Sequence, residues 1–382
     1  MNKNEKNKST ILITTSTFPR SKTDTTPRFI LDLALSLKDS WNIIVLAPHQ
    51  KGAKTEQTIS GIKVYRYRYM ISPMETLVGE GGIYPKVKKN WLYVFVVPFF
   101  LLFQLIATIR ISKREQVDLI HAHWLFPQGF IAFWAYLVTR VPYGVSSHGS
   151  EVNQLTFWLF RWAHNLALSK AQFVTTAGVE LAKKVEKYRH QSAQVIPMGI
   201  NQGFFEGKRT NVDPNSIISV GRLDKQKGFQ DIIRALPNLP DYQYTIIGEG
   251  SDRGFFEELA KKNGVQDRVY LVGSKTPEEI MQMYQTAGLF ILPSRTEGFG
   301  LSVVEAMAAG VPVITSNIEP LSTHTKSGDG ISIDTQDSSQ LQSAIKQVEK
   351  VNTQKAQKYA KAYSWQSVGH KFSALYHNIL NQ

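Results

Sequence analysis

The chain has 382 residues, which is about the length of two ordinary domains. Hydrophobic residues make up 42 % and charged residues 20 %, so the chain can bury a core and does not have a disordered composition. It contains no cysteine. This excludes a disulfide scaffold, a thiol nucleophile, zinc ribbons and iron–sulfur ligation, and it fits a reducing compartment.

The charge is unevenly distributed along the chain. The formal net charge is +13, which is typical of proteins that meet nucleic acid, an anionic membrane or a phosphorylated ligand. Residues 1–200 hold 25 Lys and Arg against 12 Asp and Glu, whereas residues 201–382 hold 19 of each. The whole basic excess therefore lies in the first half of the chain, and we predict that this half meets the polyanion.

The first half alternates predicted strands and helices. Ile11 to Ser16 is too short and too polar at its end for an export signal, so we interpret it as a first strand. Periodicity predicts further strands and helices after it. The strands are 42–47, 62–69, 118–123, 144–147 and 173–176, and the helices include 29–37 and 130–139.

A long uncharged segment, 90–109, is a candidate membrane span by its length. Pro98 and Gln104 argue against a span, and so do the strand-like segments on both sides, which a span would place on opposite sides of a bilayer. Basic residues flank both ends of the segment: Lys86, Lys88, Lys89, Arg110, Lys113 and Arg114. We therefore predict a helix over 90–114 that docks on an anionic membrane, with an ordinary buried helix as the alternative.

The second half repeats the alternation. Predicted strands at 216–220, 242–247, 268–272, 289–292 and 313–315 are separated by predicted helices at 230–236, 252–262, 277–286 and 301–309. The loop-rich stretch 199–214 predicts a domain boundary. We expect an α/β fold of two Rossmann-like, doubly wound domains that face a central cleft. They comprise residues 1–200 and 201–360, and 361–382 forms a C-terminal helix that packs back toward the first domain.

Two loops that follow predicted strands carry residues suited to a sugar nucleotide. In the loop 221–228, Arg222 and Lys227 can direct two cations at a diphosphate. In the loop 293–301, glycines allow backbone N–H groups to approach an anion at a helix N-terminus. Glu297 and Glu305 can face the same cleft, where carboxylates beside an anion site would bind hydroxyl groups.

Three histidines in the first half are candidate functional residues. His148 follows a predicted strand and is expected to be functional, because it lies at a strand end facing the cleft. His121 and His123 share one face of a strand, but the sequence offers no further suitable metal ligands nearby. No Asp-x-Asp sequence occurs. The 248–254 segment resembles a dinucleotide turn with the spacing one residue too long, which disfavours a nicotinamide dehydrogenase.

These motifs together resemble the retaining glycosyltransferases of family 4, which have the GT-B fold. The resemblance runs from about Ile11 to the last helix, and it is most specific over 216–315. It rests on Gly221-Arg222-Leu223 with Lys227-Gly228, IIGEG at 246–250, LPS at 292–294, Glu297 and Glu305 in an EX7E motif, AMAAGVPVI at 306–314, SSHGSEV at 146–152 and VIPMGIN at 195–201.

The resemblance implies roles for individual residues. Arg222 and Lys227 would hold the donor diphosphate, Glu305 the ribose hydroxyls, and Glu297 the transferred sugar, which His148 would reach from across the cleft. The implied donor contacts also include Gly221, Gly248, Glu249, Gly298, Phe299, Gly300 and Leu301. The family is metal-independent, so we expect neither a metal nor another cofactor.

The sequence departs from the family pattern in two loops. The loop 18–28 contains no glycine where the family often has a pair. Arg20, Lys22 or Arg28 could replace the missing backbone contacts to phosphate or acceptor, and His123 is expected on the acceptor side. The loop 316–320 also lacks the usual glycine pair, which puts donor-sugar contacts from this loop in doubt.

The overall prediction is a bacterial, cytoplasmic glycosyltransferase bound peripherally to the inner face of the cell membrane. It would move a sugar from a UDP- or GDP-linked donor to a lipid-linked or polysaccharide acceptor, with retention of configuration, in cell-surface polysaccharide biosynthesis. The alternative is a non-catalytic, sugar-nucleotide-binding scaffold on the membrane surface. Nucleic acid is not an expected partner, because no helix-turn-helix or aromatic–basic motif is present.

Overall fold

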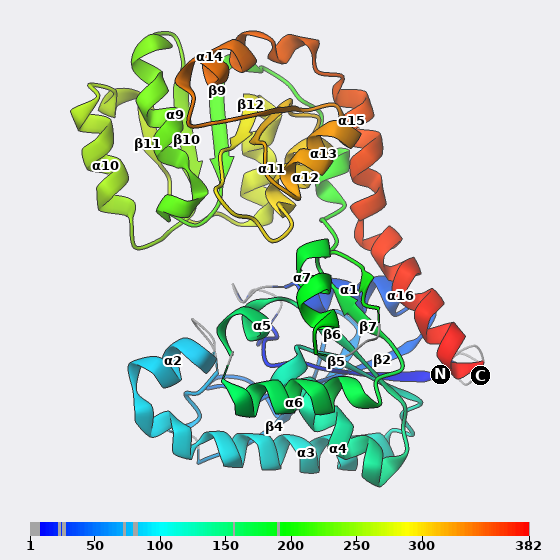
Figure 1. Cartoon of the computed structure of the whole chain (residues 1–382). Helices are drawn as coiled ribbons and strands as arrows, with labels where there is room; N and C mark the ends of the chain where they lie inside the picture. Colours follow the sequence, from blue (N-terminus) through cyan, green and yellow to red (C-terminus); the bar gives the residue numbers. More distant parts are fainter. Residues whose placement is uncertain are drawn as a thin grey trace. The chain divides into compact units, whose positions relative to one another are not determined.

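The computed structural model describes residues 8–21, 24, 28–71, 74–78, 83–155, 157–188 and 192–381. The chain divides into two compact units (Figure 1). The N-terminal unit comprises Met1–Pro197 and Val368–Gln382, and the C-terminal unit comprises Met198–Ser367. The division falls three residues before the predicted boundary at 200, and the last helix is shared between the units.

The N-terminal unit is built on an eight-stranded sheet with the order β3-β4-β2-β1-β5-β6-β7-β8. Every pairing is parallel except the antiparallel pair β3–β4. The strands are β1 (Thr10–Thr14), β2 (Asn42–Pro48), β3 (Glu56–Ile59), β4 (Ile62–Tyr67), β5 (Leu119–His123), β6 (Tyr143–Ser147), β7 (Val174–Thr176) and β8 (Gln194–Val195). Central strands such as β1 and β6 are buried along their whole length, as parallel strands covered on both faces require.

Helices connect these strands. They are α1 (Phe29–Leu37), α2 (Ile83–Lys89), α3 (Val97–Arg114), α4 (Phe130–Thr139), α5 (Ser150–Gln154), α6 (Trp158–Ser169) and α7 (Val179–Glu186), with short turns at Trp91–Phe95 and Leu125–Gly129. Helix α3 packs on β2, β4 and α4, and it runs along the edge of the unit shown in cyan in Figure 1. Because β4 before it and β5 after it lie in one sheet, α3 lies on the unit and does not leave it.

The C-terminal unit contains a six-stranded, all-parallel sheet with the order β11-β10-β9-β12-β13-β14. The strands are β9 (Asp213–Val220), β10 (Gln243–Ile247), β11 (Val269–Leu271), β12 (Ala287–Leu292), β13 (Val313–Ser316) and β14 (Ile331–Ile333). The helices are α8 (Gly203–Glu206), α9 (Phe229–Ala235), α10 (Arg253–Lys262), α11 (Pro277–Thr286), α12 (Leu301–Ala308), α13 (Leu321–Gly328), α14 (Ser338–Lys346) and α15 (Thr353–Ala360). Five strands and four helices of this unit were predicted, and their positions are confirmed within a few residues.

The last helix, α16 (Trp365–Leu380), packs from Val368 onward on the N-terminal unit. Gly369 lies against Ser36 of α1, where a Cβ would collide. The indole nitrogen of Trp41 donates a hydrogen bond of 2.9 Å to the Ser373 hydroxyl. The Tyr376 hydroxyl lies 2.6 Å from His121 Nδ1 in the core. These contacts join the C-terminal end of the chain to the first sheet.

Candidate functional site

Three loops meet at the carboxyl edge of the C-terminal sheet. They follow β9, β10 and β12, which are neighbours in the order β10-β9-β12. The backbone amide of Leu223 donates to the Glu249 carbonyl (3.0 Å), and the amide of Arg295 donates to the Gln226 carbonyl (2.7 Å). The backbones of the three loops are therefore fixed to one another at the edge where α/β sheets bind ligands.

Glycine makes this close approach of the loops possible. Gly228 has a φ of 74°, and a Cβ there would collide with the Pro293 carbonyl. A Cβ at Gly248 would likewise collide with the Gly221 carbonyl. Loop-to-loop packing requires these two glycines, so the predicted donor-site glycine at 248 also has a structural reason to be there.

Lys227 and Glu297 form the central charged pair of this edge. Lys227 Nζ lies 2.6 Å from Glu297 Oε2, and both side chains are mostly buried, with exposed fractions of 22 % and 15 %. Glu297 Oε2 also accepts from the Ser294 hydroxyl at 3.3 Å. A cation and a hydroxyl-accepting carboxylate are thus held side by side, which is the arrangement predicted for a phosphate next to a sugar.

Arg222 and Glu249 are more loosely held. The Arg222 guanidinium is 72 % exposed and lies 3.0 Å from Asp224 Oδ2, so it can swing toward a ligand. Asp224 in turn caps the turn Lys225–Lys227 by accepting from a backbone amide. Glu249, also exposed, lies in the loop after β10 and pairs at 3.4 Å with Arg253, the first residue of α10.

Helix α12 begins at this edge and carries the second predicted carboxylate. Gly300 is its N-cap, with a φ of 83°, and directs the first backbone N–H groups of the helix toward the loop that holds Glu297, Gly298 and Phe299. Glu305 is half-buried one turn into the helix, and burial raises its pKa to about 8. A carboxyl group in this state can both donate and accept a hydrogen bond, which suits a hydroxyl ligand.

His324, which was not predicted, holds the donor-side loop in place. His324 Nε2 donates to the Phe299 carbonyl (2.7 Å), and its Nδ1 accepts from the Tyr359 hydroxyl (2.8 Å). That hydroxyl also contacts the Tyr363 hydroxyl at 2.9 Å. Burial lowers the pKa of His324, so the ring is neutral and the network persists at neutral pH. Only tertiary packing reveals it, because nothing near His324 in the sequence marks it.

In the N-terminal unit, His148 follows β6 and joins a row of histidines. His148 Nε2 lies 2.9 Å from His123 Nδ1 with the two rings parallel, and His121 stacks on His123 at 4.2 Å. Among the described residues, His148 Nδ1 has no hydrogen-bond partner. His123 is 1 % exposed, and its contact with an acceptor stays a prediction.

Burial controls the protonation of these histidines. It lowers the pKa of His121 to about 3 and that of His148 to about 4, and it holds the pKa of His123 well below its usual range. All three rings are therefore neutral at pH 7. A neutral His148 can contact a hydroxyl but adds no charge to the site.

Glu151 fixes the turn that presents His148. Its Oε1 accepts from the Ser147 hydroxyl (2.7 Å) and from the His148 amide (3.3 Å), and the carboxyl is 3 % exposed. Burial raises its pKa. The sequence motif that contains Glu151 was recognised, but its function as a support for His148 was not predicted.

The two predicted arginines of the first loop lie at the surface, and Lys22, predicted with them, lies outside the described residues. Arg20 forms an ion pair of 2.8 Å with Asp24, and Arg28 precedes α1 with a guanidinium nitrogen 3.8 Å from Asp32. Both side chains are more than 40 % exposed. No cluster of three or more potential metal ligands occurs among the residues that the structure describes.

Helix α3 has an unusual distribution of polar and apolar residues. The segment Trp91–Arg114 is long and apolar enough to cross a membrane by length and composition alone. Its buried stripe nevertheless includes Gln104, Thr108 and Ser112. Large apolar side chains point outward instead: Trp91 is 67 % exposed and Phe95 is 63 % exposed. The alternative of an ordinary buried helix therefore does not describe α3.

Two family models match adjacent parts of the chain. The model for Glycosyltransferase Family 4 matches residues 26–203, and the model for Glycosyl transferases group 1 matches residues 202–365. The chain belongs to glycosyltransferase family 4. The predicted family is thus confirmed, and the matched segments meet close to the boundary between the two structural units.

Curated relatives of this family member are named glycosyltransferases. An uncharacterized glycosyltransferase of Methanocaldococcus jannaschii is 26 % identical over 267 residues, which cover 67 % of this chain and 74 % of that protein. A GDP-mannose:cellobiosyl-diphosphopolyprenol alpha-mannosyltransferase of Xanthomonas campestris is 27 % identical over 308 residues, which cover 72 % of this chain and 78 % of that protein. These names confirm the prediction of an enzyme that transfers glycosyl groups.

Solved structures confirm the GT-B fold. The sucrose-phosphate synthase of Thermosynechococcus elongatus superimposes with a TM-score of 0.73 at 18 % sequence identity, covering 98 % of this chain and 100 % of that one. The likeness includes both parallel-sheet units. The predicted fold of two Rossmann-like domains is confirmed.

Proposed function

We propose that this glycosyltransferase moves a sugar, with retention of anomeric configuration, from a UDP- or GDP-linked donor to a lipid-linked acceptor at the inner face of the cell membrane. The observation that carries the donor half of the proposal is the pairing of Lys227 with Glu297 at the carboxyl edge of the C-terminal sheet. Burial of these two charges carries a desolvation cost that their mutual attraction repays only in part, so a ligand that contacts both groups can compete with the pair.

The donor diphosphate takes the place of the Lys227–Glu297 contact. Lys227 moves from the carboxylate to the phosphate oxygens. The exposed side chain of Arg222 can turn toward the same phosphates and adds a second cation. Glu297 is then free to accept from hydroxyls of the transferred sugar, and Glu305 can contact the ribose. Because two side-chain cations neutralise the leaving group, we propose that no metal ion is required.

The chemical step breaks the bond between the anomeric carbon and the phosphate oxygen. The electron pair leaves with the nucleoside diphosphate, whose growing charge Lys227 and Arg222 stabilise. An acceptor hydroxyl attacks from the face that the phosphate leaves, and its proton passes to a phosphate oxygen. The products are the glycosylated acceptor and a protonated nucleoside diphosphate, with configuration retained.

A lipid-linked acceptor is supported by two independent observations. One relative is named for action on a diphosphopolyprenol-linked acceptor. In this chain, the segment Trp91–Arg114 exposes large aromatic side chains, and Arg110 within it and Lys88 and Lys89 just before it are exposed as well. Aromatic groups beside cations are typical of surfaces that dock on anionic lipid. We therefore propose a peripheral, cytoplasmic-face location, in surface polysaccharide biosynthesis.

The proposal is tested by sugar transfer to membrane extracts or synthetic lipid-linked acceptors from a panel of radiolabelled UDP- and GDP-sugars. Wild-type protein should transfer one of them, and EDTA should leave the rate within about twofold. Lys227→Ala should lower the rate by about 100-fold or more, since it removes charge stabilisation of the leaving group. Arg234→Ala, an exposed cation on α9, serves as the matched control.

The non-catalytic scaffold considered from the sequence predicts a different result. A scaffold would bind a sugar nucleotide, shown by a rise in melting temperature, yet transfer nothing to any acceptor. Transfer by Lys227→Ala at the wild-type rate would refute the assigned site, whereas binding without transfer by wild-type protein would favour the scaffold.

A further inference from the structure

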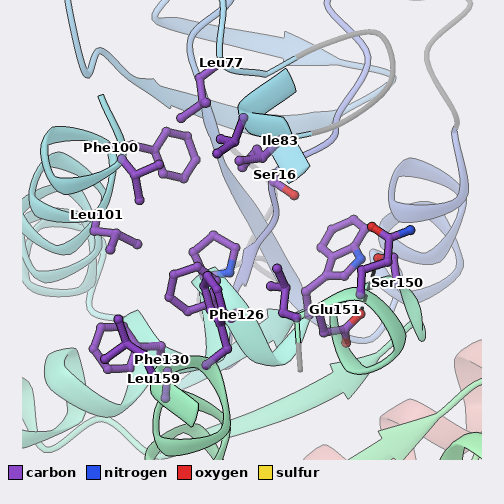
Figure 2. Close-up of a pocket in the computed structure, with 18 of the residues that line it drawn as sticks. Ser16, Leu77, Ile83, Phe100, Leu101, Phe126, Phe130, Ser150, Glu151 and Leu159 are labelled. Atoms are coloured by element: carbon purple, nitrogen blue, oxygen red, sulfur yellow. Dashed lines mark hydrogen bonds between the residues drawn. The ribbon is translucent and has the colours of Figure 1, made fainter. Parts of the chain in front are cut away.

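A deep apolar pocket lies within the N-terminal unit, and neither the family match nor the proposed chemistry assigns it. Its volume is about 510 Å³, which is within the range of small-molecule sites. Its wall is formed mainly by aliphatic and aromatic side chains of α2, α3, α4 and α6. Figure 2 shows Phe100 and Leu101 of α3 on one side of the pocket, with Phe126, Phe130 and Leu159 near them.

One end of the pocket reaches the strand edge that carries His148. Ser16 follows β1, Trp124 follows β5, and Glu151 follows β6, and all three line the pocket. In Figure 2 the labelled polar residues gather on the side away from Phe100 and Leu101. The Trp124 ring lies 4.9 Å from the His148 ring, so this polar end of the pocket is one aromatic ring away from the predicted catalytic histidine.

The other end is continuous with the exposed apolar surface. Val94, Leu159 and Trp162 line the pocket and are also 52 %, 46 % and 48 % exposed. Val87 lines the pocket as well, and the next two residues, Lys88 and Lys89, are exposed cations. The pocket therefore leads from a surface of aromatic and basic side chains to the carboxyl ends of β1, β5 and β6.

We infer that this pocket holds the isoprenoid chain of the lipid-linked acceptor, taken from the membrane by its first prenyl units. The inference rests on the proposed function and specifies its acceptor. A wall of this kind has almost no hydrogen-bonding groups to offer a free sugar or nucleotide, whereas it matches a hydrocarbon chain in shape and polarity. The prenyl chain already has apolar surroundings in the bilayer, so moving it into the pocket gains little free energy. The pocket therefore serves to position the lipid.

This arrangement explains the order of chemistry along the pocket. The chain enters from the bilayer at the apolar mouth, where the basic residues meet anionic lipid headgroups, and it lies between α3 and α6. The diphosphate and the headgroup sugar follow it at the Ser16–Trp124 end beside His148. The buried carboxyl of Glu151 lies at that end, where it can accept a hydrogen bond from a hydroxyl of the headgroup sugar.

The test is a titration in solution that needs neither donor nor membrane. Farnesyl diphosphate and isopentenyl diphosphate share a headgroup and differ by two prenyl units. Isothermal titration should show farnesyl diphosphate binding the full-length protein about tenfold more tightly or better. Leu101→Trp, which fills the pocket, should remove this preference, and Leu102→Trp should keep it, because Leu102 is exposed on the same helix outside the pocket.

Equal binding of the two diphosphates by wild-type protein, or a preference that survives Leu101→Trp, would overturn the inference. If Leu101→Trp does not fold, Leu159→Trp at the mouth replaces it, with Leu137→Trp on α4 as its control. Transfer assays separate this outcome from the proposed function. If the protein glycosylates a water-soluble acceptor but shows no chain-length preference, the transferase function stands and the prenyl-binding role of the pocket is refuted. If it binds the longer chain more tightly but transfers no sugar, the pocket inference stands and the transferase function is refuted.

Discussion

Replacing the two most exposed aromatic side chains that precede α3 should release the protein from anionic membranes. Trp91 is 67 % exposed and Phe95 is 63 % exposed, and their rings are 5.7 Å apart. Complete burial of one such side chain is worth about 1.5–3 kcal/mol. Burying about two-thirds of both on docking therefore contributes ~2–4 kcal/mol. The double variant Trp91→Ser, Phe95→Ser should bind vesicles ~30- to 1,000-fold more weakly, at 1.4 kcal/mol for each factor of ten.

The assay is co-sedimentation with vesicles of phosphatidylcholine and phosphatidylglycerol, titrated by lipid concentration. Val179→Ser, which changes an apolar residue of α7 that is 58 % exposed, is the control and should bind as the wild type does. Urea unfolding of the double variant should match the wild type within about 0.5 kcal/mol, since both side chains are at the surface. A change in vesicle affinity of less than about threefold would refute the docking of this face.

Two further substitutions test the donor-side edge. Folding raises the pKa of Glu305 from 4.5 to about 8, so between these pH values the folded protein binds more protons than the unfolded chain, and its free energy of unfolding falls as pH rises. Glu305→Gln should remove this decline between pH 5 and pH 8 in urea titrations, and parallel curves for both proteins would contradict it. Tyr359→Phe leaves His324 Nδ1 without its donor and should cost about 1–3 kcal/mol of stability while raising the donor KM more than Tyr270→Phe does. An unchanged melting temperature and KM would show that the network does not hold the loop.

The strands of both sheets could be predicted because central parallel strands are continuous apolar runs between turn residues. The strand Leu289–Leu292, for example, is preceded by a glycine and followed by Pro293, and the structure places β12 there. The short edge strands β3, β8 and β14 were not predicted. Their residues are only partly buried, so hydrophobic patterning does not mark them.

The candidate site was predictable where its residues are close in sequence. Glu297 and Glu305 are related by one loop and one helical turn, and Lys227 reaches them because β9 and β12 are neighbouring strands. His324 and Tyr359 contribute through contacts across 25 and 35 residues, which no local pattern specifies. The apolar pocket is harder still to predict from the sequence, because it exists only through the packing of four helices that form its wall.

The polarity of α3 connects the charge of the sequence with the location of the enzyme. A helix on a water-exposed surface buries its apolar side chains, but α3 buries Gln104 and Ser112, each with a side-chain oxygen that has no hydrogen-bond partner among the described residues. Such burial is unfavourable in water, and the exposure of Phe99 on the opposite face adds to the cost. Under the proposed function, a bilayer on that face would remove the second cost, and the basic excess of residues 1–200 would supply the attraction to anionic lipid. The donor edge, in the half with no net charge, needs only Lys227 and Arg222 as local cations. The proposed function therefore assigns the net charge of this chain to the surface on which the protein works, and it assigns phosphate binding to single side chains.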